Sequence, residues 1–287
     1  MSEKSIEWTK IIGWLLFTLA IMFFCFQMAY LYANKTFQVE YVDDRIFYII
    51  NIVCVICLSL AVIFLLKLTN KWKNVWIAIA SLFVMINGVL LIVNNQEIKN
   101  VINISPNYKH VISLKTNTDT GQTTYYRNYY GILARPKEKL PYEVAGDFKV
   151  DWLTDDIGAV TYQGTDNHVH QFIATYGTRS DSNSYYNVGP EIYGTWQGEN
   201  VKVISDTQGI TVTHNGNSEL FEFNHVVQFG TIAVVLTREN EAAWTIALNK
   251  NIKINTAENR QPTGDISLYK ATMEETEPII LQSQALE

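Results

Sequence analysis

Residues 46–66 read IFYIINIVCVICLSLAVIFLL, a stretch without a single charged side chain. A transmembrane helix needs about 20 consecutive apolar residues to cross the hydrocarbon core of a bilayer. Two more uncharged stretches of similar length flank this one, at residues 11–33 and 75–94. Because lipid offers no hydrogen-bond partner to a free backbone group, each stretch is predicted to be a helix. The sequence therefore predicts a transmembrane region over residues 1–98.

The Lys and Arg residues near the spans predict an orientation, because short cytoplasmic segments carry an excess of these residues. Five lie in the N-terminus and the loop between the second and third spans, against three on the opposite side. We therefore expect the N-terminus in the cytoplasm and the region after residue 98 outside the cell. The five are Lys4, Lys10, Lys67, Lys71 and Lys73, and the three are Lys35, Arg45 and Lys99.

The cysteines and the overall charge indicate a cellular setting. Cys25, Cys54 and Cys57 all lie in the predicted spans, so the outer region has no cysteine. Exported eukaryotic domains more often carry disulfides, and their absence favours a bacterial plasma membrane. A net charge of −6 and the absence of a basic stripe exclude a nucleic-acid-binding protein as the leading hypothesis.

Residues 99–254 show the alternation of apolar and polar side chains that is typical of strands, and short polar links with glycine favour hairpins between them. The predicted fold class is a three-helix transmembrane region followed by an all-β domain, an antiparallel meander that is sandwich-like or partial-propeller-like. Residues 255–287 are predicted to be a loosely attached tail, with a helical pattern only near Asp265–Glu275. The predicted strands are His110–Thr116, Thr123–Tyr130, Phe148–Leu153, Gly158–Gln163, Val169–Tyr176, Val201–Ser205, Ile210–His214, Glu219–Phe223, Thr231–Thr237 and Trp244–Asn249.

The predicted spans contain no ionisable Asp, Glu, Lys, Arg or His, the residues that mark ion and proton pathways in transporters and channels. Asn51, Asn87 and Gly88 are the polar and small residues that favour helix–helix association. We therefore expect the spans to serve as an anchor that associates with another membrane protein or with copies of themselves, and a solute channel is disfavoured.

Two clusters in the β region could carry chemistry. His168 and His170 lie on one strand face beside Asp166, a set that can bind zinc or copper if a further ligand joins it. The acids of the Asp151–Asp156 region lie beside Trp152, an arrangement compatible with a cell-envelope hydrolase. Surface histidines and acidic turn residues explain both patterns without catalysis. We therefore predict no catalytic residue and no cofactor, and keep the hydrolase as the alternative.

Tyrosines are the most suggestive feature of the outer region. In TYYRNYY, the alternation of a strand puts Tyr126 and Tyr130 on one face, where they can form a contact surface. The longest loop signal, Gly177–Pro190, adds Arg179, Tyr185 and Tyr186. These residues predict a non-enzymatic protein that binds, senses or acts as an accessory subunit. Its expected partners are the bilayer, another membrane protein or a second copy, and an envelope polymer or peptide.

Overall fold

The computed structural model describes residues 3–177, 187–253 and 262–284. The chain divides into two compact units, one formed by Met1–Ile102 with Ser113–Lys139 and the other by Asn103–Ile112 with Leu140–Glu287. This division differs from the predicted boundary at residue 98, because the strands that directly follow the helices belong with them.

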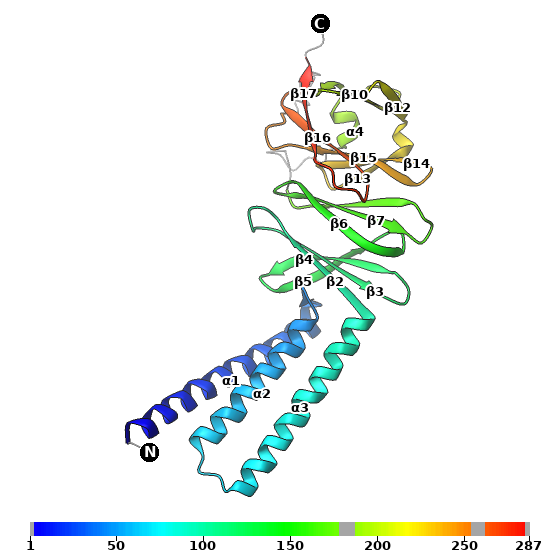
Figure 1. Ribbon diagram of the computed structural model, residues 1–287. Helices are drawn as coiled ribbons and strands as arrows, with labels where there is room; N and C mark the ends of the chain where they lie inside the picture. The colour runs from blue at the N-terminus through cyan, green and yellow to red at the C-terminus, as the bar shows by residue number, and fades with distance from the viewer. Residues whose placement is uncertain (1–2, 178–186, 254–261, 285–287) are drawn as a thin grey trace. The chain divides into compact units, whose positions relative to one another are not determined.

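Three long helices begin the first unit: α1 (Glu3–Phe37), α2 (Arg45–Leu65) and α3 (Asn70–Glu97) (Figure 1). Each is long and apolar enough to cross a membrane, which confirms the predicted three-helix region and indicates a membrane protein.

Small residues at heptad spacing bring α1 close to α2. Gly13 and Ala20 are buried small residues seven positions apart, and the buried polar Gln27 follows at the same spacing. A Cβ atom on Gly13 would lie 2.9 Å from the Leu65 side chain, and the Cys54 thiol donates a hydrogen bond to the Ala20 carbonyl at 3.4 Å. Close approach at small residues is typical of helix packing in membranes.

A five-stranded sheet completes the first unit, in the order β1-β5-β4-β3-β2. Strand β1 lies in the short link between α1 and α2, and its Glu40 and Tyr41 pair with Ala134 and Leu133 of β5. The link between two helices is thus part of the sheet. The bounds are β1 Glu40–Tyr41, β2 Ile98–Ile104, β3 Val111–Asn117, β4 Thr123–Tyr130 and β5 Leu133–Lys139.

The second unit contains a three-stranded sheet in the order β6-β7-β8 and a nine-stranded sheet in the order β12-β11-β10-β9-β17-β16-β15-β14-β13. Every neighbouring pair in both sheets is antiparallel, as predicted. Strand β12 also contacts β14, so the edges of the larger sheet approach each other, and β8 contacts β13, β14 and β15. The bounds are β6 Val144–Thr154, β7 Ile157–Gly164, β8 Val169–Thr175, α4 Val188–Glu191, β9 Gly194–Gln197, β10 Val201–Ser205, β11 Ile210–His214, β12 Asn217–Phe221, η1 Phe223–His225, β13 Val226–Phe229, β14 Ala233–Arg238, β15 Glu241–Leu248, β16 Asp265–Lys270 and β17 Ile279–Gln284.

The loosely attached tail is a wrong prediction. Residues Asp265–Lys270 form β16 rather than a helix, and β17 pairs with β9, so both strands lie inside the nine-stranded sheet. Ile266, Leu268, Tyr269 and Leu281 are fully buried in the hydrophobic core of this unit. In β16 the apolar Ile266 and Leu268 alternate with polar Asp265 and Ser267, and in β17 Leu281 is the buried residue.

Candidate functional site

A cavity of about 280 Å³ lies in the second unit, where β7 and β8 of the three-stranded sheet meet β13, β14 and β15. Its volume is near the lower end of the range for small-molecule sites, which is roughly 300–1,000 Å³. The lining residues are Pro141, Tyr142, Tyr162, His170, Gln171, Asn224, His225, Val227, Phe229, Val235, Thr237, Asn240 and Ala242.

Tyr162 on β7 is the unusual member of this lining. Its side chain is fully buried, and its hydroxyl hydrogen has no acceptor among the described residues. Burial raises the pKa of Tyr162 well above its usual value, although the nearby Tyr142 amide acts in the opposite direction. The phenol therefore keeps its proton at neutral pH, and a buried donor without an acceptor costs about 1–3 kcal/mol.

His170 on β8 forms the wall beside Tyr162. Its ring stacks on Tyr142 with centroids 3.7 Å apart, and its Nε2 lies 2.9 and 3.0 Å from the two Asp166 oxygens. A Cβ atom on Gly164 would clash with both Asp166 and His170, so a glycine is needed where the turn brings them together. These contacts hold the His170 ring in one orientation.

Gln171 links the two sheets behind the cavity. Its Nε2 donates to the Thr161 hydroxyl at 2.8 Å, and its Oε1 accepts a hydrogen bond from the Thr245 hydroxyl of β15. All three side chains are buried, so this part of the cavity is rigid and its polar groups are satisfied.

Among the described residues, the lining contains no Asp, Glu, Lys or Arg. Aromatic and aliphatic side chains form the walls, and the amides of Asn224 and Asn240 lie at the exposed rim. A site of this composition favours an uncharged ligand with both apolar surface and hydrogen-bonding groups.

The structure brings Asp166 and His170 of the predicted metal site into contact, with His168 beside them. The ring centroids of His168 and His170 are 6.5 Å apart, the His170 Nε2 lies 2.9 Å from an Asp166 oxygen, and the His170 ring stacks on Tyr142. No group of three or more His, Cys, Asp or Glu side chains capable of holding a metal ion exists within residues 3–177, 187–253 and 262–284. The alternation of the strand predicts a shared face, but no third ligand from these residues approaches it.

The acids of the Asp151–Asp156 region each contact a different partner. Asp151 accepts a hydrogen bond from the Tyr269 hydroxyl, Asp155 pairs with Lys250 at 2.6 Å, and the Asp156 carboxylate accepts one from Thr154 at 2.7 Å. The first two contacts tie β6 and the following turn to β16 and the loop after β15, as structural acids do.

The two tyrosines predicted to share a surface, Tyr126 and Tyr130, differ in exposure. Tyr130 is 73% exposed, whereas Tyr126 is buried and its ring lies under the Lys115 ammonium, 4.5 Å from the centroid. Register shifts after Tyr125 and after Asn128 interrupt the alternation on which the shared face depends. Tyr126 therefore does not contribute to a surface. Arg179, Tyr185 and Tyr186 lie outside the described residues.

Asn51 and Asn87 join the three helices to one another. Asn51 accepts a hydrogen bond from Gln27 of α1 at 2.8 Å and donates one to Asn87 of α3 at 3.3 Å. The Tyr41 hydroxyl of β1 donates to Gln27 at 2.6 Å, which extends the chain of contacts to the sheet. Gly88 differs, because a Cβ atom there would meet no described residue within 4 Å. Association within the chain thus uses the two asparagines and not Gly88.

Lys115 forms the polar centre of the first unit. Its side chain is 5% exposed, and its ammonium lies 2.8 Å from Glu40 and 2.5 Å from Asp44. Burial raises the pKa of Asp44 in spite of the attraction of Lys115. This ion pair fixes β3 to the link between α1 and α2.

Sequence reasoning finds His170 but misses Tyr142, Tyr162 and Gln171, which come from separate segments and share no motif. Comparison with models of known protein families, with curated proteins and with solved structures found no match.

Proposed function

We propose that this chain is a membrane-anchored binding protein whose β region binds a small uncharged group, such as a sugar unit of an envelope polymer. The observation that carries the proposal is the buried Tyr162 hydroxyl, a donor without an acceptor among the described residues, in a cavity that they line without charge. A ligand oxygen that accepts this hydrogen bond removes the cost of the unpaired donor.

The remaining lining supports a sugar as the ligand class. Sugar rings offer C–H faces that pack on aromatic side chains and hydroxyl groups that bond to amides. Tyr142 and Phe229 supply aromatic surface, and Asn224 and Asn240 supply amides at the rim. A charged ligand would leave its charge unpaired in this cavity, which is unfavourable.

We also propose a cellular location and an orientation for the protein. We place the protein in a bacterial plasma membrane with its N-terminus in the cytoplasm and the cavity outside the cell. The excess of Lys on one side of the helices and the confinement of the cysteines to them support this placement.

A sensing or accessory role follows if the helices associate with a second membrane protein or a second copy. The open space beside Gly88 on α3 supports this step, since small residues let helices approach closely. We propose binding rather than hydrolysis, because the Asp151–Asp156 acids lie outside the cavity lining and contact structural partners.

The test is saturation-transfer NMR on the full chain in lipid nanodiscs, with triacetylchitotriose as the probe. We expect transfer to the sugar in the wild type and its loss on Thr237→Trp, which fills the cavity from β14. Tyr130→Trp is the matched control, because Tyr130 is exposed and lies in the other unit. No transfer in the wild type, or equal transfer in Thr237→Trp, contradicts the proposal.

A further inference from the structure

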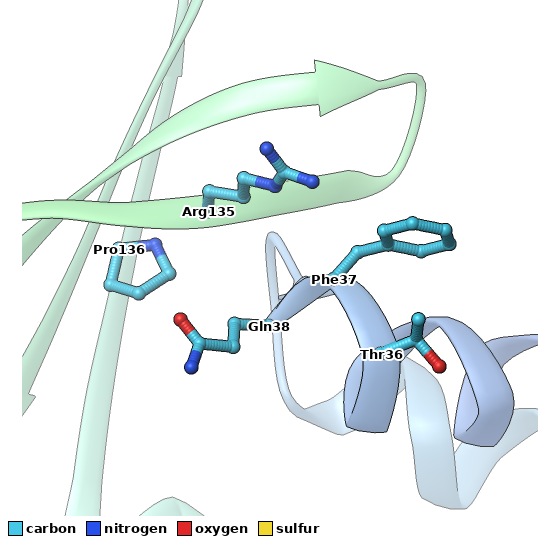
Figure 2. A pocket seen from close by; sticks show the side chains of 5 residues that line it. All are labelled: Thr36, Phe37, Gln38, Arg135 and Pro136. Carbon is cyan, nitrogen blue, oxygen red and sulfur yellow. The ribbon is translucent and has the colours of Figure 1, made fainter.

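A second cavity, of about 270 Å³, lies in the first unit at the end of α1. Figure 2 shows its lining: Thr36, Phe37 and Gln38 from the last residues of α1 and the position after it, and Arg135 and Pro136 from β5. Three of these side chains carry hydrogen-bond donors, the guanidinium, the hydroxyl and the amide, and none of them is a carboxylate. The chemistry of this lining is therefore suited to an anion.

Arg135 is the central group of this cavity. Its Nε atom is shielded from solvent and has no hydrogen-bond acceptor, and its guanidinium forms no ion pair among the described residues. The guanidinium carbon lies 4.1 Å from the centroid of the Tyr129 ring, so one face of the guanidinium makes a cation–π contact. A shielded guanidinium nitrogen without an acceptor is unfavourable, and an anion in the cavity would supply one.

The nearby acids are engaged elsewhere. Glu40 and Asp44 bind Lys115, and Asp43 binds Arg45 at 2.5 Å. Arg127 lies directly opposite Arg135 on β4, which adds a second positive side chain to the same face of the hairpin. Glu40, Asp43 and Asp44 thus pair with Lys115 and Arg45 and not with Arg135.

The surroundings of this cavity favour a lipid headgroup as the source of the anion. The cavity begins at the last turn of a helix that is apolar enough to span a membrane, and Phe37 is half exposed. Tyr129, Tyr130 and Ile132 at the tip of the β4–β5 hairpin are exposed as well. Aromatic side chains beside cations are typical of the level of lipid headgroups. Arginine binds phosphate oxygens in pairs through its planar fork.

We propose that this cavity binds a phosphate group, and that its occupant in the membrane is the headgroup phosphate of a phospholipid. This site is separate from the sugar-binding proposal, because it lies in the other unit and shares none of its residues.

The test measures thermal unfolding of the delipidated full chain in neutral detergent. Phosphatidylglycerol is compared with a galactosyl diacylglycerol that has the same acyl chains but no phosphate. Inorganic phosphate is compared with chloride at equal ionic strength. We expect phosphatidylglycerol to raise the melting temperature more than the galactolipid, and Arg135→Gln to weaken the apparent affinity about tenfold. Lys137→Gln, which removes a charge from an exposed position of the same strand, is expected to behave as the wild type.

A saturable effect of inorganic phosphate that Arg135→Gln abolishes supports the phosphate site and identifies the free anion as sufficient. An effect limited to the phospholipid supports the headgroup as the occupant. If Arg135→Gln does not fold, Arg135→Lys and Thr36→Val test the same point, because each retains most of the side-chain volume and removes donors. If these variants respond to phosphatidylglycerol and to inorganic phosphate as the wild type does, the proposal is overturned.

Discussion

Two buried tyrosines in the second unit, Tyr162 and Tyr269, differ in the fate of their hydroxyl groups. The Tyr269 hydroxyl donates to Asp151, whereas the Tyr162 hydroxyl hydrogen has no acceptor among the described residues. Removing a satisfied donor loses a hydrogen bond, and removing an unsatisfied one relieves a cost.

We therefore predict opposite effects of the same substitution. Tyr162→Phe is expected to raise the free energy of unfolding by about 1 kcal/mol, and Tyr269→Phe to lower it by a similar amount or more. Chemical unfolding of the full chain, followed by near-UV circular dichroism, measures both. Loss of stability in Tyr162→Phe would show that the hydroxyl has an acceptor in solution.

The contact of Asp166 with His170 predicts a pH dependence. Burial acts to raise the pKa of Asp166, but hydrogen bonds from the His168 amide and the His170 ring outweigh it and hold this pKa below its usual value. A carboxyl whose pKa is lower in the folded state stabilises the fold above its unfolded pKa, about 3.9, and loses this contribution as the pH falls through the folded pKa.

The melting temperature is thus expected to fall below about pH 4, and less steeply in Asp166→Asn than in the wild type. Because the Asp166 side chain is 39% exposed, the difference should be small. Parallel pH profiles for the two proteins would mean that Asp166 makes no contribution.

At the level of elements, the contact between α1 and α2 depends on Gly13. A Cβ atom added at Gly13 would lie only 2.9 Å from Leu65, whereas one added at Gly88 on α3 would face open space. Gly13→Leu is expected to separate the helices and cost about 1–3 kcal/mol by overpacking, and Gly88→Leu to leave the fold unchanged.

The measurement is thermal unfolding in detergent, together with cross-linking between α1 and α2. Gly88→Leu also tests the predicted association, because it should weaken binding to a second chain without affecting this fold. Equal stability of the two variants would contradict the packing of α1 on α2.

The same elements show what can be predicted from the sequence. The helices and the strands β4, β10 and β11 follow from it closely, because long apolar runs and clear alternation are local signals. Strand β5, which reads LARPKEK, has no alternation and contains a proline, and β9 has only four residues. Both are strands because their neighbours pair with them, which is a tertiary effect.

The cavity around Tyr162 is harder to predict from the sequence, because it depends on tertiary packing. The shared face of His168 and His170 follows from local geometry, but the stacking of Tyr142 and the approach of β13 to β8 depend on how distant segments pack. The lack of an acceptor for the Tyr162 hydroxyl is a property of that packing and has no signal in the sequence.

On the scale of the whole chain, the C-terminal strands decide whether the second unit folds. Because β17 pairs with β9 and β16 with β15, these two strands connect the two halves of the nine-stranded sheet. We predict that truncation after Lys253 abolishes the fold of this unit, while the helices remain inserted. Protease resistance of the membrane-bound protein measures this, and a truncated chain as resistant as the full one would contradict the topology.

The central proposal is a neutral ligand held by Tyr162 in the second unit. The most direct measurement is isothermal titration of triacetylchitotriose into the full chain in nanodiscs, for the wild type and Tyr162→Phe. We predict saturable binding that weakens about tenfold in the variant while its fold is retained, since one buried hydrogen bond is lost. Equal affinity in the two proteins, or no binding to either, would contradict the proposal.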